Sequence, residues 1–128
     1  MFTRPRKAIL LVDHGSRLAE ANNLLAEVAS LIERSSPGHV VKPAHMELAE
    51  PTIEQGFDAC VAAGAVDITV QPYMLGPGRH ATQDIPRLVD EAARRHPGVA
   101  YRVTGPLGLH EGLARAVLDR VQEAESKV

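Results

Sequence analysis

Short apolar runs rich in β-branched residues alternate along this chain with longer segments whose apolar residues recur at helical spacing. A strand buried on both faces reads as a continuous apolar run, whereas a helix on a sheet needs only an apolar stripe. The expected strands are 8–12, 40–46, 66–73 and 99–103, and the expected helices are 19–34, 50–63, 84–95 and 111–125. Strands that alternate with helices in this way predict an α/β fold with a parallel sheet covered on both faces.

The order of the strands follows from the handedness of the crossovers. Right-handed βαβ connections leave few topologies, and the expected one is a four-stranded, doubly wound sheet of flavodoxin-like order 2-1-3-4. The 128 residues are enough for one core and too few for two independent ones. We therefore expect a single domain over residues 1–128.

Composition and charge exclude several classes of function. The formal net charge is −2, without the clustered basic excess that binding to nucleic acid or an anionic membrane needs. Cys60 is the only cysteine, no apolar stretch approaches the roughly 20 residues of a membrane span, and the run that ends at Asp13 is too short for a signal peptide. A cytoplasmic location is expected. The chain lacks GxGxxG and GxxxxGK[ST], so we expect no nucleotide cofactor.

Two loops leave the predicted sheet at its switch point, and each contains a histidine, a glycine and an arginine. In a 2-1-3-4 sheet this point lies outside the carboxyl ends of strands 1 and 3. His14 follows the first of these strands and His80 follows the third, about 66 residues later. Two imidazoles near a carboxylate suit Co²⁺, Fe²⁺, Ni²⁺ or Zn²⁺. The alternative is structural, with His14 at a strand end and Ser16 capping the first helix.

Other polar residues near this edge are candidates for the same site. Glu47 and Glu50 follow the second strand, and which of them acts is left open. The alternatives are that Glu47 is a solvated strand-end carboxylate and that Glu50 simply starts the next helix. Arg17, Arg79 and Arg87 are suited to bidentate pairing with carboxylates or phosphates, and the alternative for each is a solvated surface side chain. Gly78, in the Gly-Pro-Gly segment before His80, permits a flexible rim.

The remaining histidines and the cysteine have structural interpretations. His39 and His96 lie in Pro-Gly turns at the opposite edge of the sheet, where solvated residues are expected. His45 is expected to pack within the second strand or to be half exposed. His110 is expected to cap the last helix, and Cys60 to lie in the core.

Several segments together resemble one protein family. HGSR after the first strand, Asn22 in the first helix, MELAEP, PYMLGPGRHATQDIP and GPLGLHEGL resemble the short form of the class II chelatases. These are the CbiX-type sirohydrochlorin cobaltochelatases and ferrochelatases, and the likeness runs from about residue 8 to residue 118.

The resemblance implies ATP-independent insertion of a divalent metal into a tetrapyrrole. It implies that His14 and His80 face the metal and that Glu47, the first glutamate of MELAEP, assists. Longer relatives contain two such halves, so the resemblance also implies one chelatase half-unit that pairs as a homodimer. Asp13 departs from the small residue common before this histidine, and either orients the imidazole or ends the strand. The His-rich or Cys-rich tails of some relatives are missing, so no Fe–S cluster is expected.

The leading hypothesis is therefore a sirohydrochlorin chelatase of siroheme or cobalamin biosynthesis. Co²⁺, Fe²⁺ or Ni²⁺ would be the metal substrate, held by His14 and His80, which could also accept the pyrrole protons. The chemistry of the substrate makes Arg17, Arg79 and Arg87 candidate anchors for its carboxylates. The apolar side chains of Met74 and Leu75 are candidates for contact with the macrocycle face. The alternatives are a metal or tetrapyrrole carrier without turnover and a bare interaction module.

Overall fold

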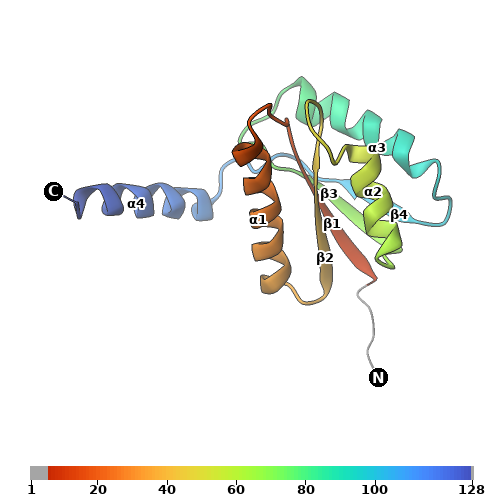
Figure 1. Ribbon diagram of the computed structural model, residues 1–128, viewed down its shortest axis with the longest axis horizontal. Helices are drawn as coiled ribbons and strands as arrows, with labels where there is room; N and C mark the ends of the chain where they lie inside the picture. Colours follow the sequence, from red (N-terminus) through yellow and green to blue (C-terminus); the bar gives the residue numbers. More distant parts are fainter. Residues whose placement is uncertain (1–5, 128) are drawn as a thin grey trace.

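The computed structural model describes residues 6–127, in which four strands alternate with four helices (Figure 1). The strands are β1 (Lys7–Asp13), β2 (His39–His45), β3 (Asp67–Pro72) and β4 (Ala100–Val103). The helices are α1 (Ala19–Ser35), α2 (Ile53–Ala62), α3 (Ile85–Ala93) and α4 (Glu111–Glu125), and a π-helical turn, η1 (His80–Asp84), leads into α3. The predicted alternation is confirmed, with strand ends that differ from the prediction by one residue.

The sheet is parallel and has the strand order β2-β1-β3-β4, which confirms the predicted flavodoxin-like topology. In the central strand Val12 pairs with Ala44 on β2 and with Pro72 on β3. The carboxyl ends of β1, β2 and β3 therefore lie side by side at one edge of the sheet. The loops that leave these three strands meet at that edge, as the topology requires.

A packed layer covers each face of the sheet. Successive side chains of β1 point to opposite faces and so contribute alternately to the two layers. Leu10 and Val12 point into the main core, which α2 and α3 cover with Phe57, Ile85 and Val89. A second, smaller cluster lies on the other face beneath α1 and consists of Leu11, Leu25, Ala29 and Val41. The predicted place of Cys60 is confirmed, since it is fully buried, and burial raises the pKa of its thiol to about 12.

The first turn of α2 is closed by local hydrogen bonds. The Thr52 hydroxyl accepts from the Gln55 N–H, and the Gln55 side chain accepts from the Thr52 N–H, which forms a capping box. Gly64 follows the helix with φ of 100°, a conformation that favours glycine and stops the helix as expected.

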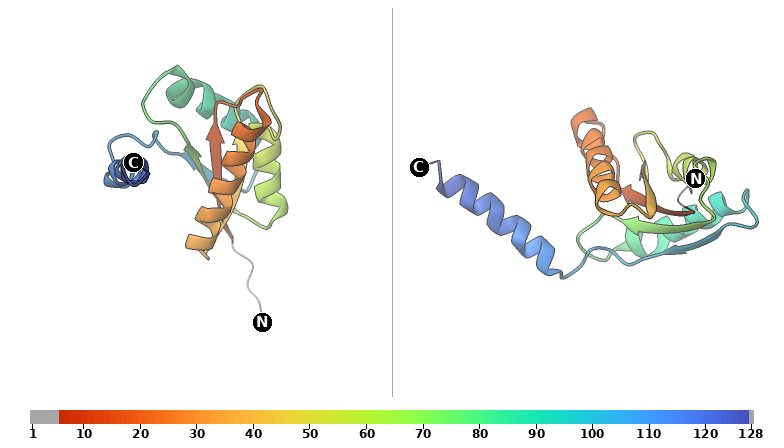
Figure 2. Two further views of the ribbon diagram at one scale, coloured as in Figure 1. Left: turned by 60° about the vertical axis from the view of Figure 1, so that its left-hand side comes forward. Right: turned by 90° about the horizontal axis from the view of Figure 1, so that it is seen from below.

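The expectation that α4 would cover the sheet is wrong. This helix has no buried residue, and both Figure 1 and Figure 2 show it extending away from the sheet. Its apolar stripe lies open to solvent, with Val117 61%, Leu118 65% and Val121 46% exposed. The spacing of its apolar residues predicts a helix with one face packed against another surface, but it does not specify which surface that is.

The solvated turns expected around His39 and His96 are only partly confirmed. His39 shares a hydrogen bond of 2.7 Å with the Ser36 hydroxyl. The His96 ring stacks on Phe57 and bonds the Asp58 carboxylate over 2.7 Å, so it joins α2 to the end of α3. Both are structural contacts at the edge opposite the histidine loops. Within residues 6–127, none of the helices combines the length and apolarity that crossing a bilayer requires.

Candidate active site

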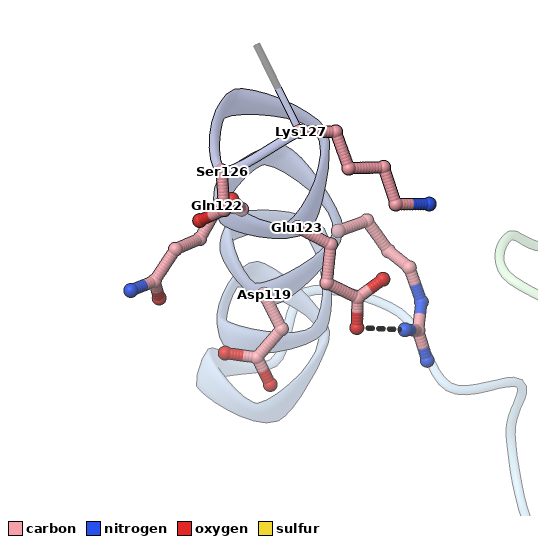
Figure 3. Close-up of a pocket in the computed structure, with 6 residues that line it drawn as sticks. Asp119, Gln122, Glu123, Ser126 and Lys127 are labelled. Carbon is pink, nitrogen blue, oxygen red and sulfur yellow. Dashed lines mark hydrogen bonds and ion pairs between the residues drawn. The ribbon is translucent and has the colours of Figure 1, made fainter.

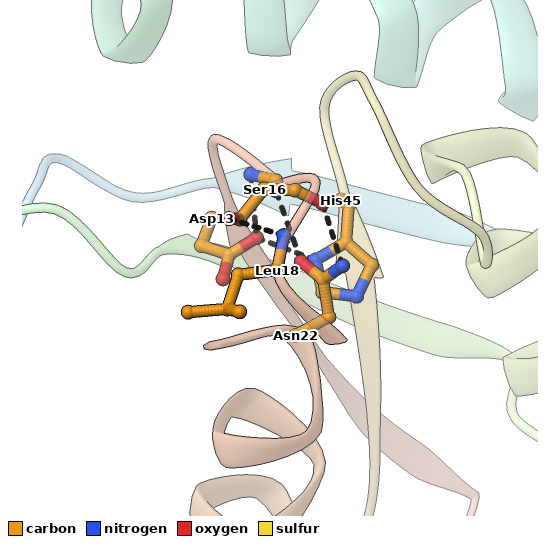
Figure 4. Close-up of polar contacts among 6 residues, drawn as sticks. Asp13, Ser16, Leu18, Asn22 and His45 are labelled. Carbon is orange, nitrogen blue, oxygen red and sulfur yellow. Dashed lines mark hydrogen bonds and ion pairs between the residues drawn. The ribbon is translucent and has the colours of Figure 1, made fainter. Parts of the chain in front are cut away.

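Asp13 is the last residue of β1, and its carboxylate supports the loop that follows. Oδ1 lies 2.6 Å from His45 Nδ1 and accepts a hydrogen bond of 2.9 Å from the Gly15 N–H (Figure 4). His45 is only 2% exposed. Of its two expected states, packed within the strand or half exposed, the structure shows the first. Because a carboxylate only accepts, His45 donates from Nδ1. Asp13 therefore ends the strand, as one of its two alternatives had it, and its carboxylate bonds the neighbouring strand and the loop backbone and not the His14 ring.

The loop after β1 lies directly against the loop after β2. The N–H groups of Met46 and Glu47 donate to the carbonyls of Asp13 and His14, at 2.9 and 3.1 Å. Gly15 has φ of +89°, and a Cβ placed on it would come within 1.8 Å of the Glu47 carbonyl oxygen. Only glycine allows this approach together with this conformation. His14 is thus held at the edge of the sheet by backbone contacts on both of its sides.

Ser16 and Asn22 close the same loop onto α1. The Ser16 N–H donates to Asn22 Oδ1 over 3.0 Å, and Asn22 Nδ2 donates to the Ser16 carbonyl over 2.7 Å (Figure 4). The alternative role of Ser16 as a helix cap is not found, because the N-cap residue of α1 is Leu18 and no side chain caps it. The Ser16 hydroxyl instead accepts from the Leu18 N–H within the loop.

His80 is expected in the open loop after β3, but it lies at the start of a π-helical turn. Both the N–H and the hydroxyl of Thr82 donate to the Gly78 carbonyl, at 2.9 and 2.7 Å. His80 Nδ1 lies 2.8 Å from Asp84 Oδ2, four residues further along. Single π-helical turns are rare and are frequently found at functional sites.

The two predicted histidines meet. The ring centroids of His14 and His80 lie 5.0 Å apart, with the planes at 85°. A pocket of about 340 Å³ opens beside them, lined by His14, Tyr73, Met74, Leu75, Gly76, Pro77, Gly78, His80 and Ala81. Met74 is largely buried at the base of this pocket, whereas Leu75 is 70% exposed at its rim. The structure therefore brings together His14, His80, Met74, Leu75 and Gly78 from the predicted set.

The other predicted residues lie outside the walls of this pocket. Arg17, Arg79 and Glu47 are exposed, and their side chains do not line it. Arg87, on α3, has its guanidinium 3.5 Å from Glu91 and 3.9 Å from Asp84. Whether these four residues act in the site stays a prediction.

The pair of histidines offers two imidazole rings at one place, which as metal ligands would be two at most. In the part of the chain that the structure describes, no three His, Cys, Asp or Glu side chains converge to hold a metal ion. A divalent ion takes four or more ligands. Two imidazoles thus leave coordination positions for water or for nitrogen atoms of a ligand.

A larger hollow lies elsewhere and has a different character. It has a volume of about 600 Å³ and is lined by polar side chains of the last turns of α4 alone (Figure 3). Arg120 and Glu123 bond each other there over 2.6 Å. Among residues 6–127, no other element supplies an opposing wall to this hollow and no histidine lines it, so the pocket beside His14 and His80 is the better candidate for chemistry.

Sequence reasoning missed two supporting residues of the site. Asp84 stands four residues after His80, and this spacing on a helix places two side chains on one face. The contact of His45 with Asp13 depends on the register of β1 and β2, which pairs the two residues directly. The first signal was readable in the sequence, whereas the second required the strand pairing.

Comparison with known proteins places this geometry in a family. A family model described as CbiX matches residues 8–124. The chain belongs to the CbiX family. This CbiX chain is 45% identical over 120 residues to the chloroplastic sirohydrochlorin ferrochelatase of Arabidopsis thaliana, covering 94% of the chain and 53% of that protein. It is 31% identical to the sirohydrochlorin cobaltochelatase of Methanococcoides burtonii, covering 90% of the chain and 94% of that protein.

A solved structure agrees with the fold of this CbiX chain. The sirohydrochlorin chelatase SirB from Bacillus subtilis subspecies spizizenii, in complex with cobalt, superposes with a TM-score of 0.83 at 37% identity. The match covers 92% of the chain and 50% of SirB. The chain therefore spans about half the length of several relatives and nearly the whole length of a short one.

Proposed function

We propose that this chain inserts a divalent metal, Co²⁺ or Fe²⁺, into sirohydrochlorin without ATP. The observation that carries the proposal is the contact between His14 and His80, whose ring centroids lie 5.0 Å apart beside a partly apolar pocket. Relatives named as sirohydrochlorin ferrochelatases and cobaltochelatases support the choice of substrate. Ni²⁺ suits the same ligands, since first-row ions compete by availability as much as by affinity.

The chemistry of insertion makes two demands that imidazoles can meet. The metal must lose water as it approaches the macrocycle, and two pyrrole N–H protons must leave. His14 and His80 hold the metal, accept protons, or do both in turn. In this proposal Met74, Leu75 and Gly78 contact the macrocycle, Arg17, Arg79 and Arg87 anchor its carboxylates, and Glu47 assists the histidines.

We infer further that two copies of the chain build the working site. A groove of about 480 Å³ is lined by Leu75, Leu109, Leu113 and Val117, among others. Leu75 lies both in this groove and in the histidine pocket, so the open face of α4 adjoins the site. A second copy covering this face would supply the opposite wall of the pocket. Two copies would then equal the length of the longer relatives, of which this chain covers about half.

Aspartates on the apolar face of α4 are expected to dissociate this dimer. The double substitution Leu113→Asp and Val117→Asp places two carboxylates in the interface, where burial without partners is costly. We expect the dissociation constant to rise at least about 100-fold. Analytical ultracentrifugation measures it, with Gln122→Asp on the opposite face of the helix as the control. A double variant that sediments as wild type would exclude α4 from the interface.

One anaerobic assay tests the proposed activity. Sirohydrochlorin is mixed with Co²⁺, Fe²⁺ or Ni²⁺, with and without the protein, and its absorbance change is followed. A rate above the spontaneous reaction is the expected result. Binding of metal or tetrapyrrole without acceleration would indicate a carrier, and no spectral effect would leave only an interaction module. A cytoplasmic location stays a prediction, since the Arabidopsis relative is named as chloroplastic.

A further inference from the structure

We propose that Asp84 is a positioning residue that fixes His80 as its Nδ1–H tautomer and so leaves Nε2 free to bind the metal. The inference deepens the proposed function, on which it rests. The carboxylate oxygen Oδ2 of Asp84 lies 2.8 Å from His80 Nδ1. An ionised carboxylate offers no proton, so the imidazole nitrogen must be the donor. A neutral imidazole has one N–H, and its lone pair is then on Nε2.

The π-helical turn that carries both residues is anchored on its other face. Ala81 is 5% exposed and Ile85 is fully buried in the main core, one residue after His80 and Asp84 respectively. The turn therefore has a buried pair and a solvent-facing pair, each at a spacing of four residues. Packing of Ala81 and Ile85 fixes the backbone, and this leaves His80 and Asp84 together on the less buried side of the turn, with His80 lining the pocket.

The two histidines of the site are held in different ways. His14 is placed by backbone contacts of its loop, and within residues 6–127 its ring makes no hydrogen bond to another side chain. The His80 ring is placed by the Asp84 side chain. The second oxygen of Asp84 lies 3.9 Å from the exposed Arg87 guanidinium, a contact too solvated to hold the carboxylate strongly.

A fixed tautomer has a defined consequence for metal binding. Histidine ligands whose second nitrogen donates to a carboxylate are oriented by that bond. Loss of such a partner typically lowers metal affinity or activity by about 10- to 100-fold. Without Asp84, the ring of His80 would be free to rotate and to exchange its N–H between the two nitrogens. The structure thus assigns His80 as the preorganised ligand of the pair.

Two measurements on the whole protein test this inference. Long-range ¹H–¹⁵N NMR spectra of protein with ¹⁵N-labelled histidine, at about pH 8 where ordinary imidazoles are neutral, report which nitrogen of His80 carries the proton. Titration with Co²⁺ alone reports metal affinity. The variants are Asp84→Ala, which removes the acceptor, and Asp84→Asn, which keeps an acceptor oxygen without its charge. Asp90→Ala is the control, since Asp90 lies on α3, the helix that follows the turn, and accepts from Tyr101.

The wild type and Asp90→Ala are expected to show the Nδ1–H tautomer of His80. Asp84→Ala is expected to lose it and to bind Co²⁺ about 10- to 100-fold more weakly, with Asp84→Asn between the two. An unchanged tautomer in Asp84→Ala, or an affinity within twofold of wild type, would overturn the inference. Neither readout requires turnover. A wild type that shows this tautomer and binds Co²⁺ but fails to accelerate insertion would refute the proposed function alone.

Discussion

The protein with both His14→Ala and His80→Ala is expected to insert Co²⁺ or Fe²⁺ into sirohydrochlorin no faster than the spontaneous reaction. The fold brings these two imidazole rings together beside the pocket. A positioned acid or base typically contributes about 10²- to 10⁴-fold to a rate. Each single variant is therefore expected to lose at least about 100-fold. The initial rate of the absorbance change in the anaerobic assay measures the effect.

A second histidine variant controls for non-specific effects. His39→Ala removes a ring at the opposite edge of the sheet, where it shares a hydrogen bond of 2.7 Å with the Ser36 hydroxyl. We expect it to keep the wild-type insertion rate. His110, which accepts from the Gly112 N–H and caps α4 as predicted, is not suitable because it lines the groove proposed for the second copy. Circular dichroism and thermal unfolding check that the double variant is folded, which is expected because His14 is exposed and His80 lies at the pocket surface. A folded double variant with the wild-type rate would refute the assignment of both residues.

Gly15→Ala is expected to destabilise the protein and to disable the site together. Alanine at φ of +89° is disfavoured by about 1–2 kcal/mol, and its Cβ would come within 1.8 Å of the Glu47 carbonyl oxygen. A backbone oxygen cannot move aside as the end of a flexible side chain would. The two loops must therefore separate, which breaks the hydrogen bonds of Met46 and Glu47. We expect a loss of about 3 kcal/mol in the free energy of unfolding, measured by urea denaturation.

The matched control for this change is Gly38→Ala. Gly38 lies in the turn between α1 and β2, and a Cβ there would meet no atom within 4 Å. Its effect on unfolding is expected to stay within about 0.5 kcal/mol. If Gly15→Ala unfolded at the same urea concentration as the control and kept the wild-type Co²⁺ affinity, the close approach of the two loops would not be needed for the site.

The parallel sheet and its order were predictable because they depend on local patterns. Burial on both faces makes the central strand β1 a continuous apolar run from Ala8 to Val12, and right-handed crossovers allow few orders once strands alternate with helices. The same topology placed His14 and His80 at one edge, since the carboxyl ends of parallel strands lie together. The spaced set of different motifs along the chain, and no single one of them, pointed to the family.

Helix α4 shows where a pattern alone was insufficient. Val117 and Leu118 lie on an apolar stripe that predicts a packed helix, but the stripe does not name its partner. The segment around Gly105 and Gly108 leads the helix away from its own sheet, and this depends on the backbone of the connection and not on the hydrophobic period. Only the tertiary structure shows that the stripe is left open beside Leu75.

The residues alone predicted the alternating elements, the order of the sheet, the meeting of His14 with His80, and the family. These depend on periodicity, chirality and residue type, all of which are local. The tertiary structure decided which side chains support the histidines. Asp13 bonds His45 because the register of β1 and β2 pairs them, and His80 bonds Asp84 because a π-helical turn replaces the expected loop. The register arises from packing across the whole sheet, so no single segment contains it, whereas the spacing of His80 and Asp84 is readable in the sequence and only the turn that joins them is not.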